Sequence, residues 1–182
     1  VEWAPEALPL DILHEDEHVI VLNKPAGLVV HPAAGHQSGT LVNGLLAHAP
    51  EMAALPRGGI VHRLDKETSG IMLAARSPLA HKSLVAQLAD RSVSRLYSAV
   101  CRGTFSGGGA IDEPIGRHPN SRTKMAVVPD GKPAVTHYRI AKRFGAHTHL
   151  DVSLESGRTH QIRVHLAARK HPVSYTHLRA HE

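Results

Sequence analysis

"GIVHRLDKETSGIML", residues 59–73, places a charged segment between two apolar runs. This pattern, with Gly70 closing the polar part, is typical of a β-hairpin. The turn holds Arg63 and Asp65 with only Leu64 between them. On an extended chain, residues two apart lie on the same face about 6.6 Å from each other, so this cation and this carboxylate would project together. Taken alone, such a segment is more often a solvated turn than a reactive site, and the rest of the chain decides between the two.

Short apolar segments and well-marked helices surround this stretch. Strands are expected at 11–13, 19–22, 95–101, 125–128, 134–140 and 148–154. The first helix is expected over 40–48, because Pro50 ends it. The second begins with Ser77 as N-cap before a proline, and a third is expected from Thr159 to about Lys170. Because several strands follow one another directly, we expect an α+β fold with a mixed, mostly antiparallel central sheet flanked by helices.

The composition describes a basic chain with the length of one domain. Its 182 residues hold 21 Lys and Arg against 16 Asp and Glu, a formal net charge of +5, which favours a polyanionic partner. Aromatic residues are only 3%, which counts against a sheet that stacks several bases on exposed rings. The single Cys101 rules out a disulfide framework and a cysteine-based zinc site. No apolar run approaches the ~20 residues of a membrane helix, and we expect a cytoplasmic monomer.

One segment offers a metal-binding alternative. His14-Glu15-Asp16-Glu17-His18 matches the H-E-x-x-H signature of zinc peptidases. That chemistry needs both imidazoles one turn apart on one face of a helix. Apolar segments of strand character flank the motif on both sides, which favours a hairpin turn. We therefore expect no metal site, although zinc bound through His14 and His18 would make the chain a metallohydrolase.

Four ordered blocks change the interpretation of the opening stretch. They are "KPAGLVVHP" (24–32), "HRLDKETSG" (62–70), "RLYSAV" (95–100) and "SGRTHQIRVHL" (156–166). Together they resemble the RluA-type family of pseudouridine synthases, almost without gaps from residue 8 to 173. "GTLVNGLLAH" and "DEPIGRHPNSRTKMAVVPDGKPAVTHYRI" resemble most the subgroup that acts on large-subunit ribosomal RNA. The resemblance implies the pseudouridine synthase fold and an isomerase that needs no cofactor and no metal, with RNA as its partner. Transfer RNA stays open as the substrate, because relatives that act on it share every catalytic block.

The resemblance also implies a role for each residue of the site. Asp65 would be the essential carboxylate, acting as a nucleophile on the ribose or the base, or as a proton acceptor. Arg163 would pair with this carboxylate and keep it ionised. Arg63 would fill the space that the flipped uridine leaves, and Tyr97 would stack on the flipped base and assist the late proton transfer. Without the resemblance, Arg163 is an exposed helix residue and Tyr97 an ordinary strand tyrosine.

Further cations are candidates for contacts with RNA phosphates. They are Lys24, Arg117, Arg122, Lys124 and Arg158. Each one alone is more often a plain surface charge. We expect His31 and His62 to make structural hydrogen bonds.

The family pattern also sets expectations for the ends of the chain. Residues 1–173 are expected to be a partial catalytic domain without the small N-terminal RNA-binding domain of the subgroup. Residues 174–182, "SYTHLRAHE", depart from the family pattern and are expected to be a non-native tail. Missing strands would leave a sheet edge open, so we expect weak stability and poor activity. A fragment that binds RNA without catalysis is the alternative.

Overall fold

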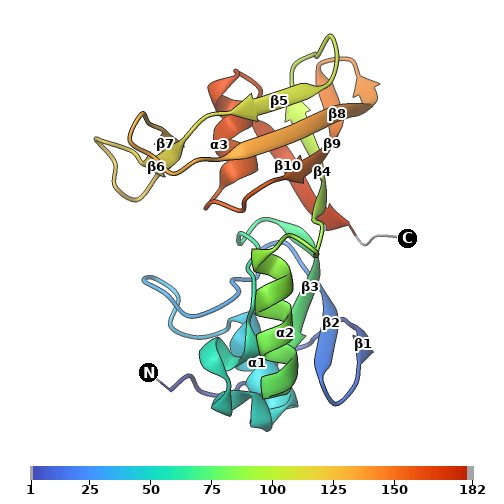
Figure 1. The fold of residues 1–182 in the computed structure, drawn as a ribbon, viewed down its shortest axis with the longest axis vertical. Helices are drawn as coiled ribbons and strands as arrows, with labels where there is room; N and C mark the ends of the chain where they lie inside the picture. The colour runs from blue at the N-terminus through green and yellow to red at the C-terminus, as the bar shows by residue number, and fades with distance from the viewer. Residues whose placement is uncertain (1, 180–182) are drawn as a thin grey trace. The chain divides into compact units, whose positions relative to one another are not determined.

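The computed structural model describes residues 2–179, and the chain divides between Val93 and Ser94 into two compact units (Figure 1). Each unit has its own antiparallel sheet and its own buried core. Among the described residues, no helix combines the length and the apolar content that crossing a membrane requires. The α+β class and the mostly antiparallel strands that the sequence predicts are confirmed.

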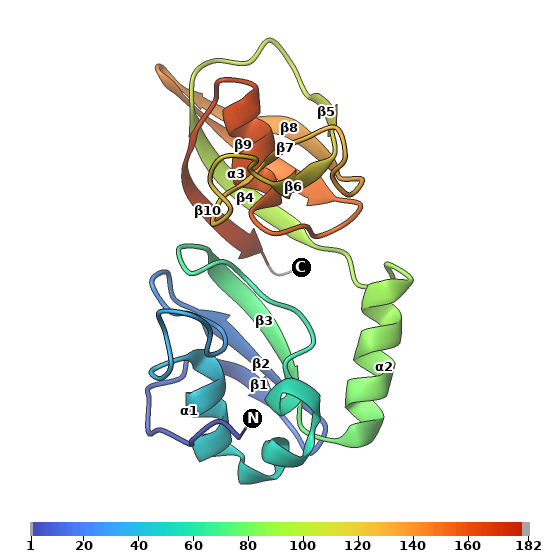
Figure 2. The same ribbon diagram turned by 90° about the vertical axis from the view of Figure 1, so that its left-hand side faces the viewer.

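The first unit builds a three-stranded sheet and covers it with helices. Its elements are β1 (Ile12–Glu15), β2 (Val19–Lys24), α1 (Leu41–His48), the 3₁₀ helices η1 (Pro50–Ala54) and η2 (Pro56–Gly59), β3 (Ser69–Ala75) and α2 (Pro78–Ala89). The strands lie in the order β1-β2-β3, and both neighbouring pairs are antiparallel, as Figure 2 shows. In this register Val19 pairs with Ala75 at one end of the sheet, and Lys24 pairs with Gly70 at the other.

Every second side chain of β2 and β3 is buried, and these side chains form part of the core of this unit. Ile20 and Leu22 of β2 and Met72 of β3 are at most 1% exposed, because residues two apart on a strand face the same side. Each such side chain stabilises the fold by roughly 1.5–3 kcal/mol when it is fully buried. On α1, Leu41 and Leu45 lie four residues apart and are 0% exposed, so both belong to the buried face of the helix.

Both predicted helices of this unit are confirmed, and so is the predicted N-cap at Ser77. Thr40 precedes α1, and its backbone N–H donates to the Asn43 side-chain oxygen (3.0 Å), which is half of a capping box. Ser77 precedes α2, and its hydroxyl accepts from the Ala80 N–H at 3.1 Å. α2 contacts β3, yet Leu79 is 71% exposed, so much of this helix surface faces outward.

The hairpin predicted over 59–73 forms only in part. Its second arm is β3, but its first arm is reduced to one isolated bridge between Ile60 and Ala74. The physical reason is that the Leu73 N–H donates to the His62 side chain (Nε2, 3.0 Å) and not to a strand carbonyl. The side chain therefore replaces the partner strand, and the backbone from residue 61 to 68 is irregular. This bond confirms the structural role expected for His62.

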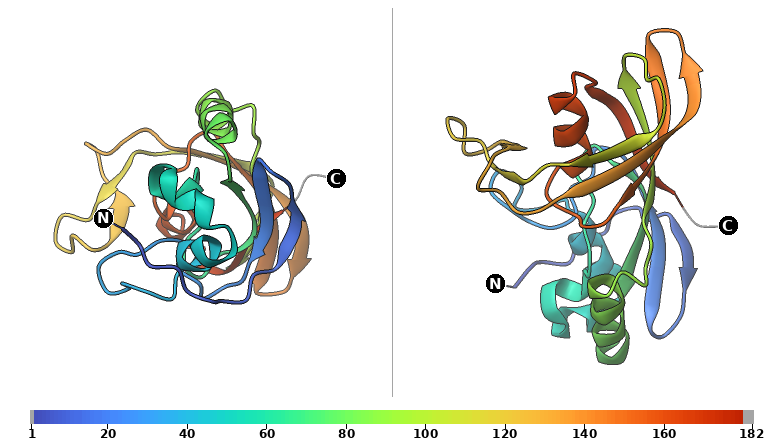
Figure 3. Two further views of the ribbon diagram at one scale, coloured as in Figure 1. Left: turned by 90° about the horizontal axis from the view of Figure 1, so that it is seen from below. Right: turned by 45° about the horizontal axis from the view of Figure 1, so that its top comes forward.

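The second unit is a five-stranded sheet with one helix. Its elements are β4 (Leu96–Arg102), β5 (Gly109–Asp112), β6 (Ile115–Arg117), β7 (Met125–Val127), β8 (Val135–Phe144), β9 (His147–Leu154), α3 (Gln161–Ala168) and β10 (Val173–Arg179). The strand order is β10-β4-β9-β8-β5, with antiparallel neighbours, and β6 pairs with β7 in a separate hairpin. Figure 3 shows β8 and β9 as a long orange hairpin beside α3, which contacts β7, β8 and β10.

The strands predicted in this unit are confirmed, and three more are present. β5 and β6 are only four and three residues long, too short to give a clear alternation. β10 includes residues 174–179, which were expected to be a tail outside the fold. In this strand Thr176 pairs with Ala99 of β4. Cys101 is 0% exposed, as expected for a packing residue, and burial raises the pKa of its thiol to about 11.

Candidate active site

Asp65 lies in a turn next to the end of the first unit's sheet where Lys24 pairs with Gly70. The Thr68 N–H donates to the Asp65 carbonyl oxygen at 3.0 Å, which closes the turn over residues 65–68. Leu64 before the turn and Thr68 at its end are 5% and 4% exposed. Both ends of the turn are therefore anchored in the interior, while Asp65 is half-buried.

Arg63 is exposed and precedes this turn. The buried Leu64 separates it from Asp65, so both charged residues lie on the accessible side of the segment. The role that the resemblance implies for Arg63 stays a prediction.

Lys24 does not lie where a phosphate could reach it, which corrects the prediction of an RNA contact. Its side chain is 0% exposed, and its Nζ donates to the carbonyl oxygens of Pro25 (2.8 Å), Leu28 (2.8 Å) and Lys66 (3.0 Å). An ammonium has three N–H donors, so all of them are used inside the protein. Burial lowers the pKa of Lys24 from 10.5 to about 8, although the nearby charges of Glu67 and Asp65 raise it.

Tyr97 lies on β4 in the second unit and pairs with Val152 of β9. Tyr97, Ala99 and Cys101 alternate along β4 on its buried face, and Tyr97 is 7% exposed. The side chain is therefore largely enclosed by protein, and its stacking on a flipped base stays a prediction.

The helix α3 carries Arg163 and begins later than predicted. It starts at Gln161 and not after a Thr159 cap, because His160 takes a left-handed backbone conformation (φ +55°) directly before it. The Gln161 side-chain oxygen accepts from the Arg158 N–H at 3.0 Å and so holds the entry to the helix. Arg163 itself is half-buried.

A buried polar network fixes α3 to the sheet of this unit. The Gln161 amide donates to the carbonyl of Val135 and to the hydroxyl of Thr136, both at 3.0 Å. His165, one turn later and 0% exposed, contacts the Thr136 hydroxyl through Nδ1 (2.7 Å) and donates from Nε2 to the Glu113 carbonyl (2.9 Å). Since buried polar groups that keep all their partners rigidify a structure, this network holds the helix that carries Arg163. Sequence reasoning missed it; the only signal was the spacing of four between Gln161 and His165.

Three of the cations that were predicted to contact RNA lie on the β6–β7 hairpin. Arg117 ends β6, and its Nη1 donates to the Arg122 carbonyl in the loop (2.9 Å). The His118 ring accepts from the backbone N–H groups of Asn120 and Ser121, both at 3.1 Å, and so shapes the loop tip. The side chains of Arg117, Arg122 and Lys124 are exposed, so this hairpin presents three cations on an ordered loop.

Arg158 is held differently from these three cations. It is half-buried, and its Nε donates to the Pro133 carbonyl at 2.9 Å. Its contact with an RNA phosphate stays a prediction. The predicted pair of Asp65 and Arg163 joins residues of the two units and stays a prediction.

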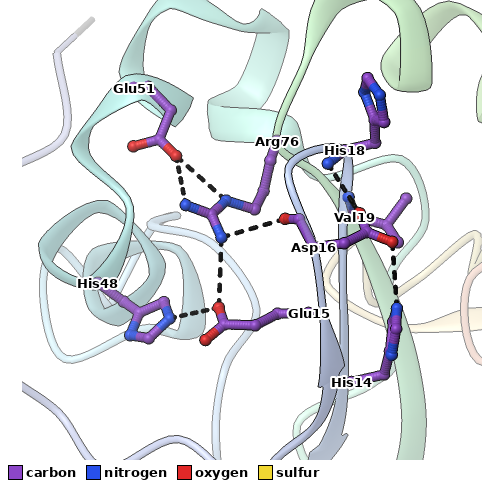
Figure 4. Close-up of polar contacts among 8 residues, drawn as sticks. All are labelled: His14, Glu15, Asp16, His18, Val19, His48, Glu51 and Arg76. Carbon is purple, nitrogen blue, oxygen red and sulfur yellow. Dashed lines mark hydrogen bonds and ion pairs between the residues drawn. The ribbon is translucent and has the colours of Figure 1, made fainter.

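The segment His14 to His18 forms a hairpin turn and not a helix, as expected (Figure 4). His14 Nε2 contacts the Asp16 carboxylate (3.1 Å), and His18 Nδ1 contacts the Ser77 hydroxyl (2.8 Å). Each imidazole therefore has its own separate partner. Within residues 2–179, the structure brings no three side chains of His, Cys, Asp or Glu together in a way that could hold a metal ion.

The same figure shows an ion cluster around Arg76, directly after β3. Its guanidinium contacts the Glu51 carboxylate (2.6 Å from Nη2) and the Glu15 carboxylate (3.4 Å from Nη1). His48 contacts the same Glu15 carboxylate at 2.7 Å. Because this cluster lies at the Val19–Ala75 end of the sheet, it is at the opposite end from the Asp65 turn and serves the fold.

Comparison with curated proteins finds close relatives. The chain is 59% identical over 172 residues to the "Ribosomal large subunit pseudouridine synthase D" of Pseudomonas aeruginosa, covering 94% of this chain and 54% of the relative. It is 58% identical over 170 residues to the protein of the same name from Xanthomonas campestris, covering 93% and 51%. The chain thus spans about half the length of the curated relatives it matches.

Solved structures agree with this result. "Human RNA Pseudouridylate Synthase Domain Containing 4" is 28% identical with a TM-score of 0.71, over 90% of this chain and 66% of that one. "Human RNA Pseudouridylate Synthase Domain Containing 1" shares the fold, with a TM-score of 0.76 at 23% identity over 93% and 76%. The family model described as "RNA pseudouridylate synthase" matches residues 18–168. The chain belongs to the RNA pseudouridylate synthase family.

Proposed function

We propose that this chain converts uridine to pseudouridine in RNA, with Asp65 as the catalytic carboxylate. The observation that carries the proposal is the Asp65 turn. A half-buried carboxylate stands between two residues anchored in the interior, in a chain that belongs to the pseudouridylate synthase family. A solvated turn would not need both of its ends buried.

The reaction is an isomerisation, so its atoms and electrons balance within the substrate. The bond from uracil N1 to ribose C1′ breaks, the base rotates, and a bond from C5 to C1′ forms. The proton on C5 leaves, and N1 gains one. An ionised carboxylate begins this sequence, by attack on the ribose or the base or by accepting a proton.

The other site residues support this carboxylate. A guanidinium next to a carboxylate favours its charged form, and we assign this role to Arg163 on the anchored helix α3. Flipping the target base out of its stack costs a few kcal/mol. Arg63 fills the space that the base leaves, and the ring of Tyr97 stacks on the flipped uracil and assists the late proton transfer.

We propose large-subunit ribosomal RNA as the substrate, since the most similar relatives carry that substrate in their name. The exposed cations Arg117, Arg122 and Lys124 of the β6–β7 hairpin contact phosphates in the bound RNA, and Arg158 adds a fourth contact. We expect the chain to act as a monomer in the cytoplasm.

The experiment maps pseudouridines in ribosomal and transfer RNA after incubation with the chain. The wild-type chain is expected to modify specific uridines of the large-subunit RNA. Asp65→Asn should form none while it still binds RNA, and Asp112→Asn is the matched control because it makes the same chemical change at an exposed aspartate of β5. Modification of transfer RNA alone would contradict the proposed substrate. RNA binding without any pseudouridine, even by the wild-type chain, would contradict catalysis and leave a binding module.

A further inference from the structure

Lys24 is a fully buried, positively charged side chain whose role the proposed reaction leaves open. It is the last residue of β2 and is 0% exposed. Lysine is almost never fully buried unless its charge is paired, because removing an ammonium from water is costly. The structure compensates this cost with three carbonyl oxygens and with the nearby negative charges of Glu67 and Asp65.

The three carbonyl oxygens come from two turns that lie far apart in the sequence. Pro25 and Leu28 belong to the turn that follows β2, whereas Lys66 lies 42 residues further along the chain, in the Asp65 turn. The Lys66 carbonyl also accepts from the Gly27 N–H at 2.7 Å. One carbonyl therefore receives two hydrogen bonds, and both come from the 24–28 segment.

This contact acts on the turn that carries the candidate catalytic residue. The Lys66 carbonyl belongs to the peptide group between Lys66 and Glu67, the central peptide of the turn over residues 65–68. The Thr68 N–H bond to the Asp65 carbonyl (3.0 Å) closes the same turn. A displacement of the Lys66 carbonyl would therefore distort this turn and move the Asp65 carboxylate with it.

We propose that Lys24 is a positioning residue for Asp65: its buried ammonium ties the turn over 65–68 to the turn over 25–28. This inference rests on the proposed function, in which Asp65 meets the flipped uridine. All three N–H donors are directed at carbonyl oxygens, so Lys24 acts through the turn and makes no contact with the substrate.

The test replaces Lys24 with methionine, which keeps the length of the side chain and removes the charge and the donors. A misplacement of about 1 Å at a reacting group can cost about 100-fold in rate. Lys24→Met is therefore expected to lower the single-turnover rate of pseudouridine formation by about 100-fold, with the Kd for RNA within about three-fold of wild type, since that variant removes no exposed charge. Lys66→Met is the matched control. It removes an exposed ammonium but keeps the carbonyl, and its rate should equal that of wild type.

Amide hydrogen exchange provides a readout that does not depend on activity. In Lys24→Met, the amides of Gly27 and Thr68 should exchange faster, because their bonds hold the two turns together. The Leu41 amide, bonded to the Val29 carbonyl at 2.8 Å in the same unit, should stay unchanged. Faster exchange at all three amides would mean general loosening of the unit and would overturn the proposal.

Two further outcomes would overturn the inference. A wild-type rate in Lys24→Met would show that the ammonium does not position Asp65, and a raised Kd with an unchanged rate would show an RNA contact. If Lys24→Met does not fold, Lys24→Gln, which keeps two N–H donors, decides in the same way through its rate and its amide exchange. If the wild-type chain forms no pseudouridine at all, the proposed function fails, whereas exchange at Gly27 and Thr68 still reports whether Lys24 holds the turn.

Discussion

Replacing Thr136 with valine tests whether the buried network holds the helix that carries Arg163. Thr136 is 0% exposed, and its hydroxyl contacts His165 (2.7 Å) and the Gln161 amide (3.0 Å). Valine has almost the same shape but no hydroxyl, so one ring nitrogen and one amide N–H lose their partner. Each buried polar group left without a partner costs about 1–3 kcal/mol, and one more buried methyl returns about 0.8 kcal/mol. Two such groups cost about 2–6 kcal/mol together, so the free energy of unfolding should fall by about 1–5 kcal/mol.

Urea denaturation followed by circular dichroism measures this loss. Thr104→Val is the control, because Thr104 is exposed and a surface change of this kind usually alters stability by less than about 0.5 kcal/mol. The double variant Thr136→Val with His165→Leu should lose less than the sum of the two single variants, since residues in one network do not act independently. A loss below about 0.5 kcal/mol in Thr136→Val would refute the reasoning, because the hydroxyl would then not be needed by either partner.

Two further predictions concern the first unit. Gly59→Ala should destabilise it far more than Gly145→Ala does the second unit. At Gly145 the backbone has a positive φ and nothing lies near, so an alanine there costs only the about 1–2 kcal/mol of a left-handed backbone. At Gly59 the added Cβ would also lie 2.2 Å from the Ala75 carbonyl oxygen. Equal losses of stability for the two variants in thermal denaturation would contradict this prediction. The hydrogen bond from Arg76 lowers the pKa of Glu51 below its ordinary value of 4.5. The ionised Glu51 carboxylate therefore stabilises the folded state above that pH, and this stabilisation is lost as the pH falls and the carboxylate is protonated. The stability difference between wild type and Glu51→Gln in urea should therefore shrink below about pH 4.5, and a difference independent of pH would contradict the role of Arg76.

Local patterns account for the parts of the fold that the sequence predicted correctly. The helix that ends before Pro50 and the N-cap at Ser77 depend on residues close in the chain, so they can be identified without tertiary information. The first arm of the hairpin over 59–73 failed for the opposite reason. The His62 side chain takes the Leu73 N–H, and no periodicity in the sequence indicates that a side chain will replace a strand.

Some parts of the candidate site could not be predicted, because they depend on contacts between residues far apart in the sequence. Lysine is usually exposed, so Lys24 was expected on the surface, whereas carbonyl oxygens of two turns enclose its ammonium, and one of them belongs to Lys66, 42 residues further along the chain. The network of Gln161 and His165 has no clear signal in the sequence, because only the fold brings the Thr136 hydroxyl within reach of both and places one further carbonyl oxygen beside each. By contrast, the order of the four motif blocks was enough to predict the family, because matches in four separate places do not occur by chance.

The central claim is that the Asp65 carboxylate starts the exchange of an N1 bond for a C5 bond in uridine. Formation of pseudouridine releases the hydrogen on C5, so RNA labelled with tritium at C5 of uridine releases tritium into water in proportion to the reaction. The wild-type chain should release tritium from large-subunit ribosomal RNA, Asp112→Asn should match it, and Asp65→Asn should be slower by at least about 100-fold. Release by Asp65→Asn at the wild-type rate would contradict the claim, and the turn over residues 65–68 would then have no part in the chemistry.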